Sequence, residues 1–142
     1  MSSVRRFVPA ASGDFGWDAV ERLRYKEEGS APFRDITRQV LFAQPDQGCE
    51  LRYFEIAPGG YSTLERHRHT HAVLILRGRG MVRLGDVEQP VAAHDLVTID
   101  PLTWHQFRAD DDSALGFLCL VSSRRDRPQL PTDEELAQLQ GR

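Results

Sequence analysis

Four side chains that can bind metal ions occupy alternate positions in one short stretch of the sequence. They are Glu65, His67, His69 and His71, and a further histidine, His105, follows far downstream. On a β-strand, alternate side chains point to the same face, so this spacing gathers imidazole and carboxylate groups on one surface. Neutral imidazole and carboxylate are ligands that Mn, Fe, Ni, Cu and Zn ions accept. The cluster is therefore a candidate metal site.

The length of a strand limits which of these groups can bind one ion together. At about 3.3 Å per residue, Glu65 and His71 would lie about 20 Å apart on a straight strand, whereas metal–ligand bonds are only about 2 Å long. Two arrangements remain open. In one, Glu65 and His67 end a strand and a turn brings His71 back; in the other, His67 and His69 form the pair. Both arrangements need His105 as a further ligand. In the alternative interpretation no metal binds, and these side chains lie on the solvent-exposed face of an edge strand.

Short runs rich in β-branched and aromatic residues, separated by Gly, Pro and Asp, begin at Ile36 and predict an all-β domain. Many short strands of this kind are typical of a sandwich or barrel. Pro58-Gly59-Gly60 predicts a tight turn and Gly85-Asp86 a hairpin. The expected strands are Ile36–Ala43, Cys49–Ala57, Ser62–His67, Ala72–Arg77, Gly80–Leu84, Glu88–Ala92, Leu96–Ile99, Trp104–Arg108 and Leu115–Val121.

The two ends of the chain differ from this pattern. Apolar residues at helical spacing predict a short helix within residues 16–25. Near the C-terminus, Thr132 and Glu135 resemble a capping box, and the leucines that follow predict a second short helix. We therefore expect an N-terminal extension over 1–35, a β-barrel over 36–123 and a C-terminal tail with a short helix over 124–142.

Composition excludes several classes of function. The 142 residues fit one domain, and a formal net charge of −3 offers no broad basic field, so nucleic acid is not an expected partner. The longest apolar run, Ala72–Leu76, is far shorter than the roughly 20 residues that cross a bilayer, and no secretion signal is recognisable, so we expect no membrane association and a cytoplasmic location. Cys49 and Cys119 lie far apart and predict reduced thiols, with Cys119 buried and inert.

The stretch from Gly59 to Gly78 resembles the first sequence motif of the cupin family. That motif is Gly, five residues, His-x-His, three or four residues, Glu, six residues and Gly, and the same spacing here connects Gly59, Glu65, His67, His71 and Gly78. Glu65 stands where the first His is usual, and His71 stands where the Glu is usual. Small single-domain cupins with an all-histidine manganese site also carry His at that later position.

Residues 94–107 resemble the second cupin motif, commonly Gly-Asp-x-Val-x-Ile-Pro with a histidine five residues past the proline. His94 replaces the Gly and Asp100 replaces the Pro. The positions that fit are Asp95, Val97, Ile99, His105 and Phe107. Together the two motifs cover about residues 59–107 in the expected order.

The resemblance implies a double-stranded β-helix, a jelly-roll-like barrel in which Glu65, His67, His71 and His105 converge. They would bind one divalent transition metal per chain, with Mn or Fe favoured and Zn, Ni or Cu as alternatives. His69 falls in the turn between strands and is the alternative to Glu65 as a ligand. Three imidazoles and one carboxylate leave open positions on a six-coordinate ion, which suit a bidentate oxygen substrate, or a substrate and dioxygen together.

Many cupins that resemble this chain are dioxygenases, isomerases or decarboxylases. We therefore expect a metal-dependent enzyme, a dioxygenase-like oxidoreductase or an isomerase, that acts on a small oxygenated molecule. The alternative is a non-catalytic cupin that binds or senses a small ligand or a metal. Exposed edge strands favour a homodimer. Strand residues that could also meet the substrate, although surface positions are favoured for each, are Arg38, Tyr53, Glu55, Arg77, Arg83 and Gln106.

Overall fold

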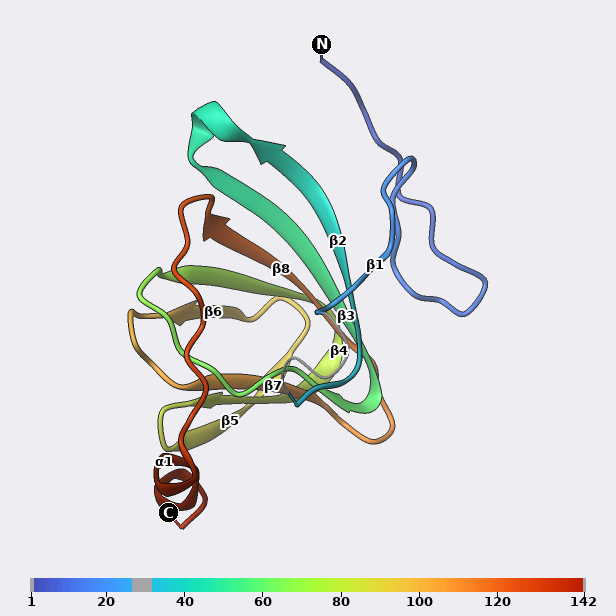
Figure 1. The fold of residues 1–142 in the computed structure, drawn as a ribbon. Helices are drawn as coiled ribbons and strands as arrows, with labels where there is room; N and C mark the ends of the chain where they lie inside the picture. The colour runs from blue at the N-terminus through green and yellow to red at the C-terminus, as the bar shows by residue number, and fades with distance from the viewer. Residues whose placement is uncertain (1, 27–31, 142) are drawn as a thin grey trace.

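The computed structural model describes residues 2–26 and 32–141, which form a β-structure with few helical turns (Figure 1). The all-β expectation is thereby confirmed. A 3-10 helix, η1 (Pro45–Gln47), and an α-helix, α1 (Asp133–Gln140), accompany the strands. The strands are β1 (Leu23–Arg24), β2 (Arg34–Gln44), β3 (Cys49–Tyr61), β4 (His71–Leu84), β5 (Val87–Ala92), β6 (Leu96–Ile99), β7 (His105–Ala109) and β8 (Leu115–Ser122).

The long strand β4 connects the two halves of the barrel. Its first half pairs with β6 and β8, and its second half pairs with β5 and β7, always antiparallel. β3 in turn pairs with β8 and with β2. The strands therefore curl around a common interior, as Figure 1 shows, and form the double-stranded β-helix that the resemblance implied.

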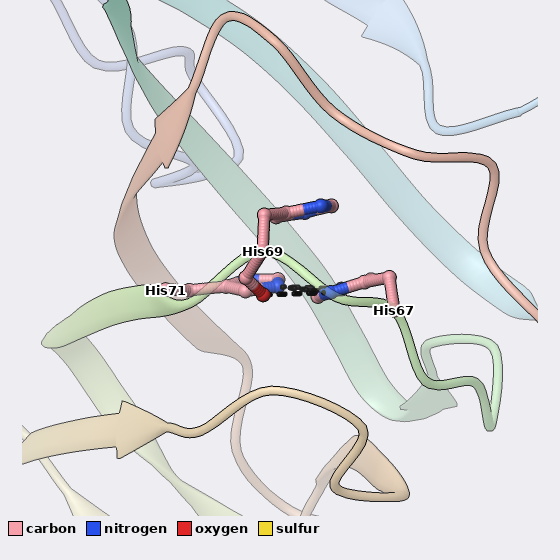
Figure 2. Close-up of side chains that lie close together, drawn as sticks. All are labelled: His67, His69 and His71. Atoms are coloured by element: carbon pink, nitrogen blue, oxygen red, sulfur yellow. Dashed lines mark hydrogen bonds between the residues drawn. The ribbon is translucent and has the colours of Figure 1, made fainter.

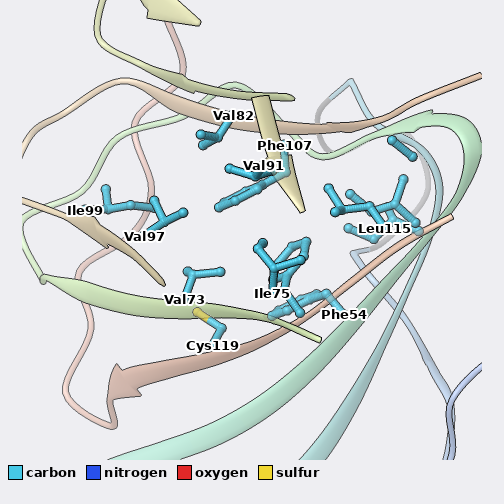
Figure 3. Close-up of a cluster of buried hydrophobic side chains, with 14 of the residues drawn as sticks. Phe54, Val73, Ile75, Val82, Val91, Val97, Ile99, Phe107, Leu115 and Cys119 are labelled. Carbon is cyan, nitrogen blue, oxygen red and sulfur yellow. The ribbon is translucent and has the colours of Figure 1, made fainter. Parts of the chain in front are cut away.

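Apolar side chains pack together in the barrel interior (Figure 3). Alternate residues of β4, such as Val73, Ile75 and Val82, are almost completely buried, and Leu115 and Phe117 of β8 pack with them. The burial of each such side chain stabilises the fold by about 1.5–3 kcal/mol. This core holds β4 and β8 rigidly at the point where β4 begins with His71.

The prediction of a helix within residues 16–25 is wrong. This segment is irregular apart from the two residues of β1, and Ala19 has a φ of 59°, which is incompatible with a right-handed helix. Phe15 and Trp17 instead pack against Tyr53 on the outer face of β3, with ring centroids 5.8 and 5.1 Å from the tyrosine ring. The apolar spacing therefore reflects aromatic side chains that cover a sheet.

Two expected strands are in fact one. The structure joins Ala72–Arg77 and Gly80–Leu84 in β4, which crosses a bulge opposite β8 between Ile75 and Arg77. Gly78 has a φ of 71°, which allows the strand to bend between the two expected segments.

The region before the histidines also differs from expectation. β3 runs on to Tyr61 through Pro58-Gly59-Gly60, which does not form the expected turn, and the strand expected at Ser62–His67 is a loop with an isolated bridge at Glu65. Gly59 has a φ of 77°, which lets β3 bend without ending. The loop permits changes of direction that a straight strand would forbid.

The expected C-terminal helix is confirmed as α1. The hydroxyl of Thr132 accepts a hydrogen bond from the backbone of Glu135, and the Glu135 carboxylate accepts one from the backbone of Thr132. The guanidinium of Arg66, in the loop that precedes β4, lies 3.6 Å from the Glu135 carboxylate. None of the helices in the described part of the chain has the length and apolar character needed to cross a bilayer.

Replacement of Gly78 by alanine should destabilise the fold far more than the same change at Gly85. Both glycines have positive φ, at 71° and 66°. A Cβ atom at Gly78 would lie 1.7 Å from the carbonyl oxygen of Ala114, whereas at Gly85 it would meet nothing within 4 Å. We expect Gly85→Ala to cost about 1–2 kcal/mol from its backbone angle alone, and Gly78→Ala to cost more than about 4 kcal/mol in urea unfolding followed by circular dichroism. Equal losses would contradict the close approach of β4 to the 110–114 turn.

Candidate metal centre

The loop of residues 62–70 between β3 and β4 carries most of the candidate ligands. Glu65 and His105 exchange backbone hydrogen bonds of 3.2 and 3.0 Å, which tie this loop to the start of β7. His71 is the first residue of β4, where pairing with both β6 and β8 fixes its direction. The topology therefore brings Glu65 and His67 beside His105, which is distant in sequence.

The histidine rings form one compact cluster. The ring of His67 stacks on those of His69 and His71, with centroid separations of 3.6 and 4.2 Å (Figure 2). His105 stands edge-on to His67 and His71, at 4.8 and 5.1 Å. Ligand atoms of His67, His69 and His71 lie within 4.8 Å of one another, and so do those of Glu65, His67 and His105. The structure thus brings all five candidate side chains together.

Hydrogen bonds at Nδ1 determine which ring nitrogens face the site. Nδ1 of His67 lies 3.0 Å from the backbone carbonyl of His69, and Nδ1 of His105 lies 2.9 Å from that of Thr103. Because a carbonyl oxygen only accepts, both Nδ1 atoms carry hydrogen and both Nε2 atoms keep a free lone pair. Metal-ligating histidines show the same arrangement, in which the second nitrogen is held by an acceptor.

The buried rings favour their neutral form. Burial, aided by the neighbouring imidazoles, lowers the pKa of His67 to about 4 and that of His71 to about 2, and burial also lowers the pKa of His105. All three are therefore uncharged at neutral pH, which is the state that binds a metal.

The chemistry of the donor set fits a cation. Nε2 of His67 lies 2.5 Å from Nε2 of His71, a hydrogen bond in which one neutral ring donates and the other accepts. Ligand atoms of His67 also lie within 4.8 Å of those of Glu65 and His105. Imidazole nitrogens together with a carboxylate make a set that a divalent transition metal accepts.

Charged side chains from both ends of the chain contact the cluster. Lys26 approaches Glu65 with 2.5 Å between Nζ and Oε2, which supplies a positive partner for a buried carboxylate. Asp126 accepts hydrogen bonds from the backbone N–H of Arg68, which lower its pKa to about 2, and lies 3.1 Å from Nδ1 of His69. His69 is thus oriented by a carboxylate, with its Nε2 directed away from it.

A pocket opens beside the histidines. Its walls combine the aromatic rings of Phe54, Phe107 and Phe117 with cationic side chains, and it also includes Thr63. The cationic residues are Lys26, Arg38, Arg52 and Arg125, and the acidic ones are Glu65 and Asp126. The described lining therefore carries more positive than negative charge, which suits an anionic ligand.

The remaining strand candidates are distributed over several places. Of these, Arg38 lines the pocket. Tyr53, Glu55 and Arg77 instead form a hydrogen-bonded group under the N-terminal segment, where Arg77 also reaches Asp14. Arg83 pairs with Glu88, and Gln106 donates to the backbone carbonyl of Ser62. The exposed His94, in a turn, is outside the cluster.

The sequence did not predict that Arg52, Lys26 and Asp126 line the pocket. Arg52 alternates with Phe54 and Ile56 on β3, and a charged residue among inward-facing apolar ones was an available signal. Lys26 and Asp126 lie in irregular segments that gave no such signal. Cys119 is buried and free as expected, but its Sγ lies 3.4 Å from Nδ1 of His71, and burial raises its pKa to about 11.

Comparison with known proteins agrees with this geometry. The family model described as the cupin domain matches residues 52–121. A protein of Rhodospirillum rubrum named 1-methylthio-D-xylulose 5-phosphate methylsulfurylase is 58% identical over 135 residues, which span 95% of this chain and 86% of the relative.

Two solved structures are also similar. A cupin 2 conserved barrel domain protein from Rhodopseudomonas palustris has a TM-score of 0.87 and 53% identity, covering 99% of this chain and 94% of the other. A cupin-2 domain protein from Rhodospirillum rubrum has a TM-score of 0.86 and 54% identity, covering 96% and 90%. With its barrel, its two motifs and a buried cluster of histidines and a carboxylate that can bind a metal, this chain belongs to the cupin superfamily.

Proposed function

We propose that this chain is a metal-dependent enzyme that acts on a phosphorylated ketose carrying a methylthio group, the kind of compound for which its Rhodospirillum rubrum relative is named. The observation that carries the proposal is the meeting of free imidazole nitrogens with a pocket whose described walls are mainly cationic and aromatic. In such a pocket, a metal held by the imidazoles would bind carbonyl and hydroxyl oxygens, and the cationic side chains of the wall would bind a phosphate.

The residues that would hold the metal are Glu65, His67, His71 and His105, with His69 as the alternative to Glu65. One divalent transition metal per chain is proposed, with Mn or Fe favoured. When bound, it would supply a Lewis acid that polarises a carbonyl or hydroxyl oxygen of the substrate.

The proposed reaction moves the methylthio group from C1 of the ketose to a thiol co-substrate. The C1–sulfur bond breaks, the thiol sulfur bonds to the methylthio sulfur, and the thiol hydrogen passes to C1 as a proton. The products are a methyl disulfide and a 1-deoxyketose, so the thiol sulfur is oxidised and C1 is reduced. The protein's own contribution is to orient the ketose and to exclude water with the rings of Phe54, Phe107 and Phe117.

Two wider alternatives remain distinct from this reaction. A dioxygenase-like oxidoreductase would consume oxygen, as many cupins do, and a non-catalytic cupin would bind a ligand without converting it. The assays below separate all three.

His105→Ala should abolish stoichiometric metal binding. Elemental analysis of the purified, untagged protein should find about one transition metal ion per chain, because the two groups of possible ligand atoms share His67. The variant removes a buried donor from the group that also holds Glu65. His94→Asn is the matched control, since His94 is exposed and Asn tolerates its φ of 81°. Stoichiometric metal retained in His105→Ala would contradict the convergent site.

Glu65→Gln should weaken metal binding by at least tenfold, whereas His69→Gln should change it much less. Glu65 lies next to His67 and His105, and Nδ1 of His69 is already engaged with Asp126. Competition with a chelator gives the two affinities. The reverse order would identify His69 as the ligand in place of Glu65.

The metal-loaded protein should convert 1-methylthio-D-xylulose 5-phosphate in the presence of a small thiol such as 2-mercaptoethanol. Proton NMR should show a new C1 methyl signal and a methyl disulfide, at equal rates in air and under nitrogen. His105→Ala should lower the rate at least a hundredfold, and His94→Asn should not. Oxygen uptake would instead support a dioxygenase, and saturable binding without conversion would support the binding role.

A further inference from the structure

The inner wall of the pocket contains two arginines whose side chains are incompletely satisfied. Arg38 of β2 and Arg52 of β3 both line it, and Nε of each is buried without a hydrogen-bond partner. Within the described residues, no carboxylate forms an ion pair with either guanidinium, whereas Arg77 pairs with Glu55 and Arg125 with Glu50. Arg38 and Arg52 therefore differ from Arg77 and Arg125, which form ion pairs with carboxylates.

Strand register makes Arg38 and Arg52 neighbours. Arg38 lies opposite Phe54, and Arg52 lies opposite Val40, so the two arginines are diagonal neighbours on one face of the β2–β3 pair. The guanidinium of Arg52 also lies over the ring of Phe54, 5.2 Å from its centroid. This contact with a rigid ring restricts the directions in which the guanidinium can point.

This arrangement is unfavourable for the protein alone. A guanidinium in a pocket wall loses hydration, and a like charge beside it adds repulsion. Burial lowers the pKa of Arg52, and Arg125 and Arg38 lower it further, while Cys119 and Glu50 raise it without reversing the shift. A bound anion would relieve both effects, because the planar guanidinium has donors in the geometry that accepts phosphate oxygens in pairs.

The arginine pair lies close to the histidine cluster. Arg52 is opposite Cys119 in the β3–β8 register, and Cys119 contacts His71. Both groups line the same pocket, so one ligand can contact the arginines and the histidines together.

We propose that Arg38 and Arg52 form a subsite for the phosphate group of the substrate and hold a phosphate monoester dianion while the carbonyl end of the same molecule lies at the histidines. The inference rests on the proposed function for the identity of the sugar. The need for an anion rests on the arginines themselves.

The test is the binding of D-xylulose 5-phosphate, and of D-xylulose as its neutral counterpart, to the metal-loaded protein by isothermal titration calorimetry. Arg38→Gln and Arg52→Gln should each weaken binding of the phosphorylated sugar by tenfold to a hundredfold, the range expected for one charged hydrogen-bonded contact. Arg52→Lys keeps the charge but loses the planar fork, so it should show a smaller loss. Arg83→Gln is the matched control, because it removes the same charge from an arginine that pairs with Glu88 outside the pocket.

Thermal unfolding of the same variants gives a second readout. Because each wild-type guanidinium has a buried Nε without a hydrogen-bond partner, Arg38→Gln and Arg52→Gln should melt at the same temperature as the wild type or higher. Lower melting temperatures with unchanged binding of the phosphorylated sugar would show that the arginines serve the fold, and would overturn the subsite.

The outcomes separate this inference from the proposed function. Unchanged binding in both pocket variants, or a wild type that binds D-xylulose as well as its phosphate or binds neither, overturns the subsite even if the methylthio sugar is converted. Binding that depends on both arginines, in a protein that leaves the methylthio sugar unchanged, supports the subsite and overturns the proposed reaction.

Discussion

The pairing of β4 is the constraint on which the rest of the structure depends. One strand joins β6 and β8 through its first half and β5 and β7 through its second half, so an error in its register would disrupt both halves of the barrel. Side chains alternate along a strand, and a slip of one residue would turn His71 out of the interior. The glycine at 78 and the adjacent bulge let this strand bend without losing its register.

The site is assembled from groups that stabilise one another poorly without a ligand. Several imidazole rings are buried side by side, and Arg38 and Arg52 face the pocket with buried, unpaired Nε atoms. Buried polar groups without full partners weaken a fold unless a ligand completes them. The apolar core, where residues such as Ile75 and Leu115 are fully buried, offsets this cost. The two regions adjoin, because Val73 and Phe117 belong to the core and also line the pocket.

Local spacing predicted a β domain and a cluster of possible ligands at residues 65–71, whereas the barrel in which His105 joins them followed from the resemblance to the cupin motifs. Residues 65–71 and His105 needed only a turn and one strand pairing to meet, and the structure supplies a loop in place of the expected strand. The positions of Lys26 and Asp126 could not be predicted in this way. Lys26 follows a segment whose course depends on the packing of Phe15 and Trp17 on Tyr53, a long-range contact that apolar periodicity misrepresented as a helix.

The stretch that matches the cupin family model, residues 52–121, holds the candidate metal ligands but omits part of the pocket wall. Lys26, Arg38 and Asp126 belong to the flanking segments. Mutations in those flanks can alter which molecules enter the pocket while the barrel and its histidines stay the same. New specificities can therefore evolve at the margins of such a domain, so shared ancestry of the barrel is a poor guide to the molecule that each descendant recognises.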